Sequence, residues 1–81
     1  MTSSTDDIIL NSFQITNPSS YTLFIKSEQE EIYPVAIYDL VGNLVHFSEE
    51  QGDASIDISD LSSAIYIVRI GNSVTRVMVS H

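Results

Sequence analysis

Short runs of alternating apolar and polar residues follow one another along almost the whole chain, and turn-forming residues separate them. Alternation with a period of two is typical of β-strands, because successive side chains of a strand point to opposite faces. No long stretch keeps the apolar spacing of an amphipathic helix. The pattern predicts about seven strands, in the segments 8–15, 21–26, 32–38, 44–47, 54–59, 64–70 and 74–79.

Turn-forming residues divide these runs at three clear places. Asn17-Pro18-Ser19-Ser20 interrupts the first apolar pattern. Asp39-Leu40-Val41-Gly42-Asn43 is typical of a tight hairpin connection in which Gly42 supplies a positive φ angle. Gly71-Asn72-Ser73 predicts another hairpin turn before the last strand. Pro34 has no N–H to donate, so we expect it near the start of its strand or on a sheet edge.

The segment 64–70 is the most apolar run and is rich in β-branched residues, which predicts a central strand. The polar segments 27–31 and 49–52 are expected to be solvated loops. The tyrosines at positions 21, 33, 38 and 66 all lie in strand patterns, so we expect them to pack in the core or at its margin. The chain is therefore predicted to be all-β, a small antiparallel Ig-like β-sandwich. We assign residues 13–81 to this domain and residues 1–12 to a leader or linker.

Composition supports a single small globular domain. The chain has 81 residues, of which 43% are hydrophobic and 17% charged, so it is not a disordered polar segment. Its formal net charge of −8 makes contact with nucleic-acid phosphates or with an anionic membrane surface improbable. The absence of cysteine excludes disulfides and thiolate chemistry. The first seven residues lack the basic start and apolar stretch of a signal peptide.

Candidate chemistry is sparse, and we expect no catalytic residue, no cofactor and no metal site. Glycine occurs only at three separated positions, which excludes a Gly-rich phosphate-binding loop. A calcium loop starting at Asp53 would place Ile58 where the sharp turn needs Gly and Ala64 where a bidentate Glu is required. The residues alone predict a small acidic β-domain that acts as a binding or targeting module rather than as an enzyme.

Four motifs occur in a characteristic order along residues 13–80. They are Thr16-Asn17-Pro18 followed by the apolar segment 21–25, the segment 35–45 with Tyr38-Asp39 and Gly42, the segment 56–70 with Leu61-Ser62 and Tyr66, and the closing segment 74–79. In this order the chain resembles the type A C-terminal sorting domain of the type IX secretion system, the Por secretion tail of Bacteroidetes. It departs from that pattern at Thr16, where the family has Pro, and at Ala64, where the family usually has Gly.

The resemblance implies a secretion and sorting signal that directs a larger cargo protein across the outer membrane and is then cleaved off. The implied partners are the type IX translocon, a sortase-like surface protease and an N-terminal cargo domain. The implied location is the periplasm in transit to the cell surface or the extracellular space, in association with the outer membrane. Cleavage is expected within residues 1–12 or in a linker before them.

The resemblance also suggests where recognition takes place. We expect it at the closing hairpin, with Tyr66, Val68, Arg69, Gly71, Arg76, Val77 and Val79 as candidate recognition residues. The motif turns are expected at Asn17, Pro18, Asp39 and Gly42. An edge strand with unpaired amides offers a template for a partner strand, and weak self-association through such an edge is a further expectation.

Two other classes of function remain open at this point. A free-standing Ig-like adhesion or carbohydrate-binding module would need exposed aromatic side chains arranged as a platform. The chain has no Trp, and its tyrosines lie in strand patterns. A small enzyme would need a convergent set of polar side chains, which the sequence does not offer.

Overall fold

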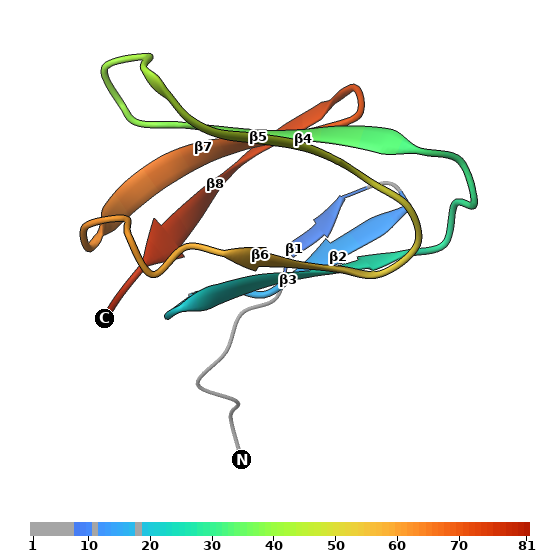
Figure 1. Ribbon diagram of the computed structural model, residues 1–81, viewed down its shortest axis with the longest axis horizontal. Coiled ribbons are helices and arrows are strands. Elements are labelled where there is room, and N and C mark those ends of the chain that lie inside the picture. Colours follow the sequence, from blue (N-terminus) through green and yellow to red (C-terminus); the bar gives the residue numbers. More distant parts are fainter. Residues whose placement is uncertain (1–7, 11, 18) are drawn as a thin grey trace.

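The computed structural model describes residues 8–10, 12–17 and 19–81, which form two four-stranded sheets (Figure 1). The N-terminal sheet has the order β1 (Ile8–Leu10), β2 (Phe13–Ile15), β3 (Thr22–Ser27), β6 (Ala54–Asp57). The C-terminal sheet has the order β5 (Leu44–Glu50), β4 (Tyr33–Tyr38), β7 (Ala64–Ile70), β8 (Ser73–Val79). All strand pairs are antiparallel, so the predicted all-β sandwich is confirmed.

The core lies between the two sheets and follows the alternation of side chains along the strands. Leu23 and Ile25 of β3 enter this core from one sheet and Val35 and Ile37 of β4 from the other, and all four are almost completely buried. The Phe13 and Tyr33 rings meet with their centroids 4.8 Å apart, in a tilted arrangement that suits aromatic pairs. The Tyr33 hydroxyl also donates a hydrogen bond to the Gly52 carbonyl, so the one polar group of this ring is satisfied.

Most predicted strands agree with the structure to within one or two residues, although β6 ends at Asp57 rather than at residue 59. Two segments differ more. The segment 8–15 is two strands, because Leu10 pairs with Phe13 and the chain turns back between them. The expected boundary after residue 12 therefore falls inside the β1–β2 hairpin, whereas residues 1–7 lie outside the described part of the chain. β5 continues to Glu50 instead of ending at Phe47, because β4 supplies pairing partners for both Glu49 and Glu50.

The central position of the 64–70 segment is confirmed, since β7 pairs with β4 on one side and β8 on the other. Pro34 lies near the start of its strand, as expected, although β4 is an interior strand. The ladder between β4 and β7 ends at the pair Val35 and Ile70, and the Pro34 carbonyl accepts a hydrogen bond from the Gly71 N–H beyond that pair. Pro34 therefore removes no bond from this ladder.

The expectation for tyrosine packing is wrong at one of four positions. Tyr33 and Tyr66 are buried, and Tyr38 is half-buried. Tyr21 is 60% exposed, because β3 begins only at Thr22 and the Tyr21 side chain lies outside the ladder. Its ring stacks on the His81 ring instead, with centroids 4.8 Å apart.

Asp39 organises the turn between β4 and β5. Its Oδ1 accepts hydrogen bonds from the N–H groups of Val41, Gly42 and Asn43, over 3.0, 2.9 and 2.8 Å. Gly42 has a φ of 104°, which confirms the predicted need for glycine there. The hydrogen bonds, led by the one from the Asn43 backbone, lower the pKa of the Asp39 carboxyl. Asp57 has a lowered pKa for a similar reason, because it accepts a hydrogen bond from the Ser59 N–H.

These hydrogen bonds predict a loss of stability in acid. A carboxyl whose folded pKa is depressed stabilises the fold above its ordinary pKa of about 4, and this contribution disappears as the pH falls through the folded value. We expect Asp39→Asn to show a smaller fall in urea midpoint between pH 5 and pH 2 than the wild type. Asp60→Asn, which removes one exposed carboxylate, is the charge-matched control. Equal pH slopes in wild type and Asp39→Asn would contradict the assignment.

Candidate recognition surface

The closing hairpin, β7 and β8, occupies one side of the C-terminal sheet. Its inward-facing side chains are part of the core: Tyr66, Val68, Ile70, Val77 and Val79 are each at most 6% exposed. Four of the expected recognition residues, Tyr66, Val68, Val77 and Val79, therefore lie where no partner can touch their side chains. Their place in the structure is to hold the hairpin against the other sheet.

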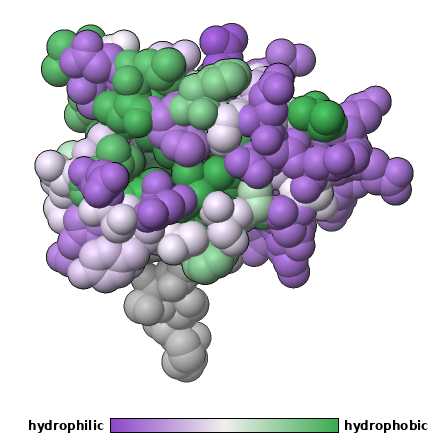
Figure 2. All heavy atoms as spheres, viewed as in Figure 1, coloured by the Kyte–Doolittle hydropathy of each residue, from purple (hydrophilic) through white to green (hydrophobic). Residues whose placement is uncertain are grey.

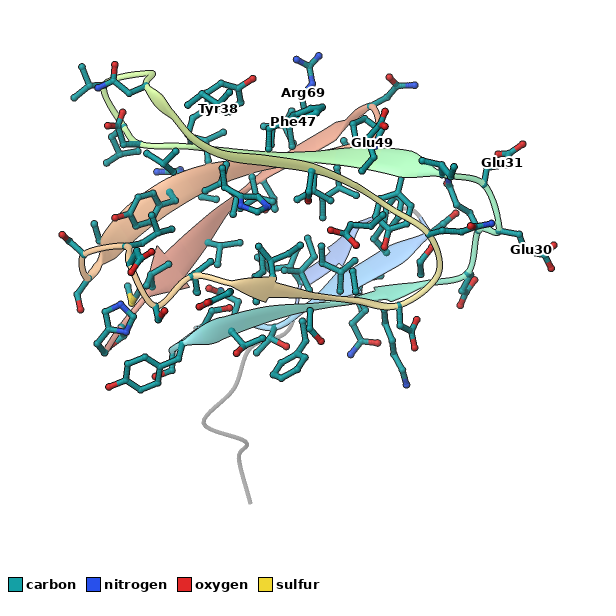
Figure 3. The ribbon with its side chains drawn as sticks, in the orientation of Figure 1. Glu30, Glu31, Tyr38, Phe47, Glu49 and Arg69 are labelled. Carbon is teal, nitrogen blue, oxygen red and sulfur yellow. The ribbon has the colours of Figure 1, made fainter. Side chains whose placement is uncertain are left out.

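The outward-facing side chains of the same hairpin meet those of β4 and β5. Strand register places Phe47, Ala36, Arg69 and Val74 in one row across the four strands of the C-terminal sheet. Figure 3 shows Tyr38, Phe47 and Arg69 on the side of this sheet that faces away from the N-terminal sheet. Arg69 and Arg76 are both exposed, so two of the expected recognition residues do present their side chains to solvent.

A shallow hollow of about 310 Å³ lies on this outer face, lined by Pro34, Ala36, Tyr38, Phe47, Arg69, Gly71 and Asn72. Gly71, with a φ of 59°, forms the predicted hairpin turn and also borders the hollow. Phe47 is 58% exposed at its rim. Sequence reasoning did not single out Phe47 or Tyr38 as surface residues, because the face to which a strand residue points depends on the pairing register.

Charge is distributed unevenly along the chain. All eleven acidic residues occur at or before Asp60, whereas two of the three cationic residues, Arg69 and Arg76, follow it. Hydrophilic surface gathers at the end of the sandwich that carries loop 28–31, and apolar surface gathers toward the β4–β5 turn (Figure 2). Leu40 and Val41 are exposed at the tip of that turn. The closing hairpin therefore contains two cationic residues and no acidic one, within a chain whose net charge is −8.

The opening turn crosses from the N-terminal sheet to the edge of β8. The Met78 N–H donates to the Asn17 side-chain oxygen over 3.0 Å. The Ser19 N–H donates to the Met78 carbonyl, and the Ser80 N–H donates to the Ser19 carbonyl, each over 2.8 Å. We call the described residues Asn17 and Ser19 the strap. The strap closes the C-terminal half of the β8 edge.

Ser19 is the residue of the strap that sequence reasoning missed. It is only 2% exposed, its hydroxyl donates to the Thr16 carbonyl over 2.8 Å, and it forms a parallel bridge with Val79. Its sequence signal, a serine within a turn-forming cluster, indicated the turn but not its contact with the last strand. Pro18 lies outside the described residues.

The described residues include neither a metal-binding cluster nor a membrane-spanning helix. Within that part of the chain, no three His, Asp or Glu side chains gather in a way that could hold a metal ion. Asp53 and Asp57 instead accept backbone hydrogen bonds, from the N–H groups of Ser27 and Ser59. None of the described segments is a helix with the length and hydrophobicity required to cross a bilayer.

The strap leads to a prediction about stability. Asn17→Ala removes the acceptor for the Met78 N–H, so we expect it to lower the free energy of unfolding by about 1 kcal/mol. Native-state hydrogen exchange of the Met78 amide should accelerate as well, whereas Asn17→Asp, which keeps a side-chain oxygen, should retain much of the protection. Unchanged Met78 protection in Asn17→Ala would show that the side chain does not close this edge.

Comparison with known proteins identifies the family. No curated protein and no solved structure matches the chain significantly. The family model described as the secretion system C-terminal sorting domain matches residues 16–80, from the residue before Asn17 to the residue after Val79. The match therefore includes both the strap and the closing hairpin, and it covers well over half of the chain. The chain belongs to the family of C-terminal sorting domains of the type IX secretion system.

Proposed function

We propose that this domain directs an N-terminal cargo protein through the type IX translocon in the outer membrane and is then removed by a sortase-like protease at the cell surface. The observation that carries the proposal is the family match over residues 16–80, since the family consists of secretion sorting signals. In this function the domain is a ligand of the translocon and a substrate of the protease, and it performs no catalysis itself.

The architecture is consistent with a signal that is recognised in its folded form. Burial of Tyr66, Val68, Val77 and Val79 stabilises the hairpin, and it leaves Arg69 and Arg76 as its exposed charged groups. A translocon that recognises this hairpin would contact the outer face of the C-terminal sheet, the β8 edge, or both. We place the main side-chain contribution at Arg69 and Arg76.

Cleavage is best placed before β1. The segment Ile8–Leu10 pairs with β2, and residues paired in a sheet are poor protease substrates because their backbone must leave the ladder before it can enter a protease active site. The segment 1–7, or a linker that precedes it in a longer protein, therefore offers the better cleavage position. After cleavage, the cargo would retain none of the sandwich.

An adhesion or carbohydrate-binding role finds less support. Such a module would need several exposed aromatic rings on one surface. Phe24 is exposed on the outer side of β3 in the N-terminal sheet, whereas Phe47 is exposed on β5 in the C-terminal sheet. The two outer faces point in opposite directions, so Phe24 and Phe47 share no platform. The hollow beside Phe47 is lined by one further ring, that of the half-buried Tyr38.

The sorting function is tested with a reporter protein that carries an N-terminal export signal and this chain at its C-terminus. In a bacterium with a type IX system, we expect the reporter at the cell surface or in the medium, and in a translocon-deficient strain we expect it in the periplasm. Mass spectrometry of the delivered reporter should find no peptide from residues 13–81. Delivery that is equally efficient without the translocon would refute the proposed function.

The role of the two arginines gives a separate prediction. Arg76 and Arg69 are exposed, so Arg76→Ala and Arg69→Ala should each change stability by less than about 0.5 kcal/mol. We expect the double variant to fold normally and yet leave the reporter in the periplasm. Lys26→Ala, which removes the remaining cationic side chain of the chain from the other sheet, is the matched control and should be delivered normally. Normal surface delivery of the double variant would show that these charges are not recognised.

A further inference from the structure

We propose that the open half of the β8 edge, Val74–Arg76, binds an extended acidic segment of the recognising protein as an additional strand. The inference rests on the proposed sorting function and specifies the contact through which recognition takes place. It assigns a backbone interaction to a strand whose inward-facing side chains are buried.

The direction of the backbone groups follows from the alternation of an antiparallel ladder. The N–H and C=O of Met78 point away from β7, because they bond to the strap. Val74 and Arg76 have the same parity as Met78 in an uninterrupted register with β7, so their backbone groups point the same way. The Arg76 carbonyl accepts one long hydrogen bond, of 3.4 Å, from the Thr75 hydroxyl. No residue of another described strand pairs with this side of Val74 or Arg76.

The strap pairs with this edge at one residue, Ser19, and also sets the limit of the open part. Ser19 already occupies a strand position beside Val79, through the hydrogen bonds to Met78 and Ser80. The opposite limit is the hairpin turn at Gly71 and Asn72. The available edge is therefore short, and a bound segment must gain further affinity from its side chains.

The charge and the exposed side chains of β8 indicate which kind of segment this edge would bind. Edge strand β5 carries Glu49 and Glu50, and edge strand β6 carries Asp57, whereas β8 contains Arg76 and no acidic residue. Charges farther away than about 8 Å are screened at physiological salt, so the charge that β8 itself offers to a partner is the positive charge of Arg76. Val74, 55% exposed, supplies an apolar contact beside it. A carboxylate flanked by apolar side chains matches this edge.

A second copy of the chain fits this edge less well. Antiparallel pairing of two β8 edges would bring two Arg76 side chains close to each other and join two molecules of charge −8. Like charges across paired strands are destabilising. We therefore assign the edge to a segment of a different protein, and self-association becomes one outcome of the test.

The key variant is Val74→Pro, with Val74→Ala as its matched control. Proline at residue 74 removes only an N–H that points away from β7, a position where an edge strand tolerates it. Val74→Ala loses the same side chain and keeps the N–H. The probe is a short synthetic peptide of alternating Val and Thr with a central Glu and blocked ends, titrated into the isotope-labelled full chain. A second peptide carries Lys in place of Glu.

We expect the Glu peptide to shift the amide signals of Val74 and Arg76 more than those of β5 or β6. Val74→Pro should weaken its binding about tenfold, the effect of one lost hydrogen bond that leaves a partner group unpaired. Val74→Ala should bind within about threefold of wild type, and the Lys peptide should bind wild type about threefold more weakly than the Glu peptide. Shifts centred on β5 or β6, equal binding of both peptides, or concentration-dependent dimerisation through β8 would overturn the proposal. The wild-type titration decides the question even if Val74→Pro does not fold.

The same pair of variants separates this inference from the sorting function. In the reporter assay, folded Val74→Pro should remain in the periplasm and Val74→Ala should reach the surface. If the wild-type reporter needs no translocon, the sorting function fails. If wild type and folded Val74→Pro are both delivered through the translocon, the sorting function stands and the edge proposal is refuted.

Discussion

The pairing of β7 with both β4 and β8 is the constraint on which the rest of the structure depends. In this register Tyr66, Val68 and Ile70 point into the core, while Ile65 and Arg69 point to solvent. A shift by one residue would exchange the two sets, placing an arginine between the sheets and three large apolar side chains in water. The core therefore holds the hairpin in the one register that exposes Arg69 and Arg76.

The same register determines what the β8 edge can offer. In this register the backbone N–H and C=O of Met78 point away from β7, toward the open side of the strand. They need hydrogen-bond partners there, and the strap supplies them. This contact joins the first turn of the sandwich to its last strand, and it covers part of an edge that would otherwise be open to uncontrolled pairing. The strap thus contributes to stability and confines the open edge to Val74–Arg76.

Acidic residues have a different role in this fold from the one expected of a catalytic or metal site. Asp39, Asp53 and Asp57 each accept backbone N–H groups at the ends of strands, where the chain must turn. Their negative charges surround the sandwich at its loops and leave the closing hairpin without any. The contrast between acidic loops and a basic hairpin distinguishes the β8 edge from the β5 and β6 edges, which carry carboxylates.

Local sequence determined the strands, the turns and the sandwich class, because alternation, glycine at Gly42 and Gly71, and the β-branched run of β7 act over a few residues. Sequence motifs also indicated the family, because they preserve the order of these local elements. Only the tertiary structure decided which faces and edges are exposed. Tyr21 lies outside the core, β5 extends to Glu50, and Ser19 reaches Val79, because each depends on contacts between segments far apart in the chain. For the same reason the sequence pointed to the closing hairpin as the recognition element, whereas the pairing of β7 and β8 decided which of its residues face solvent.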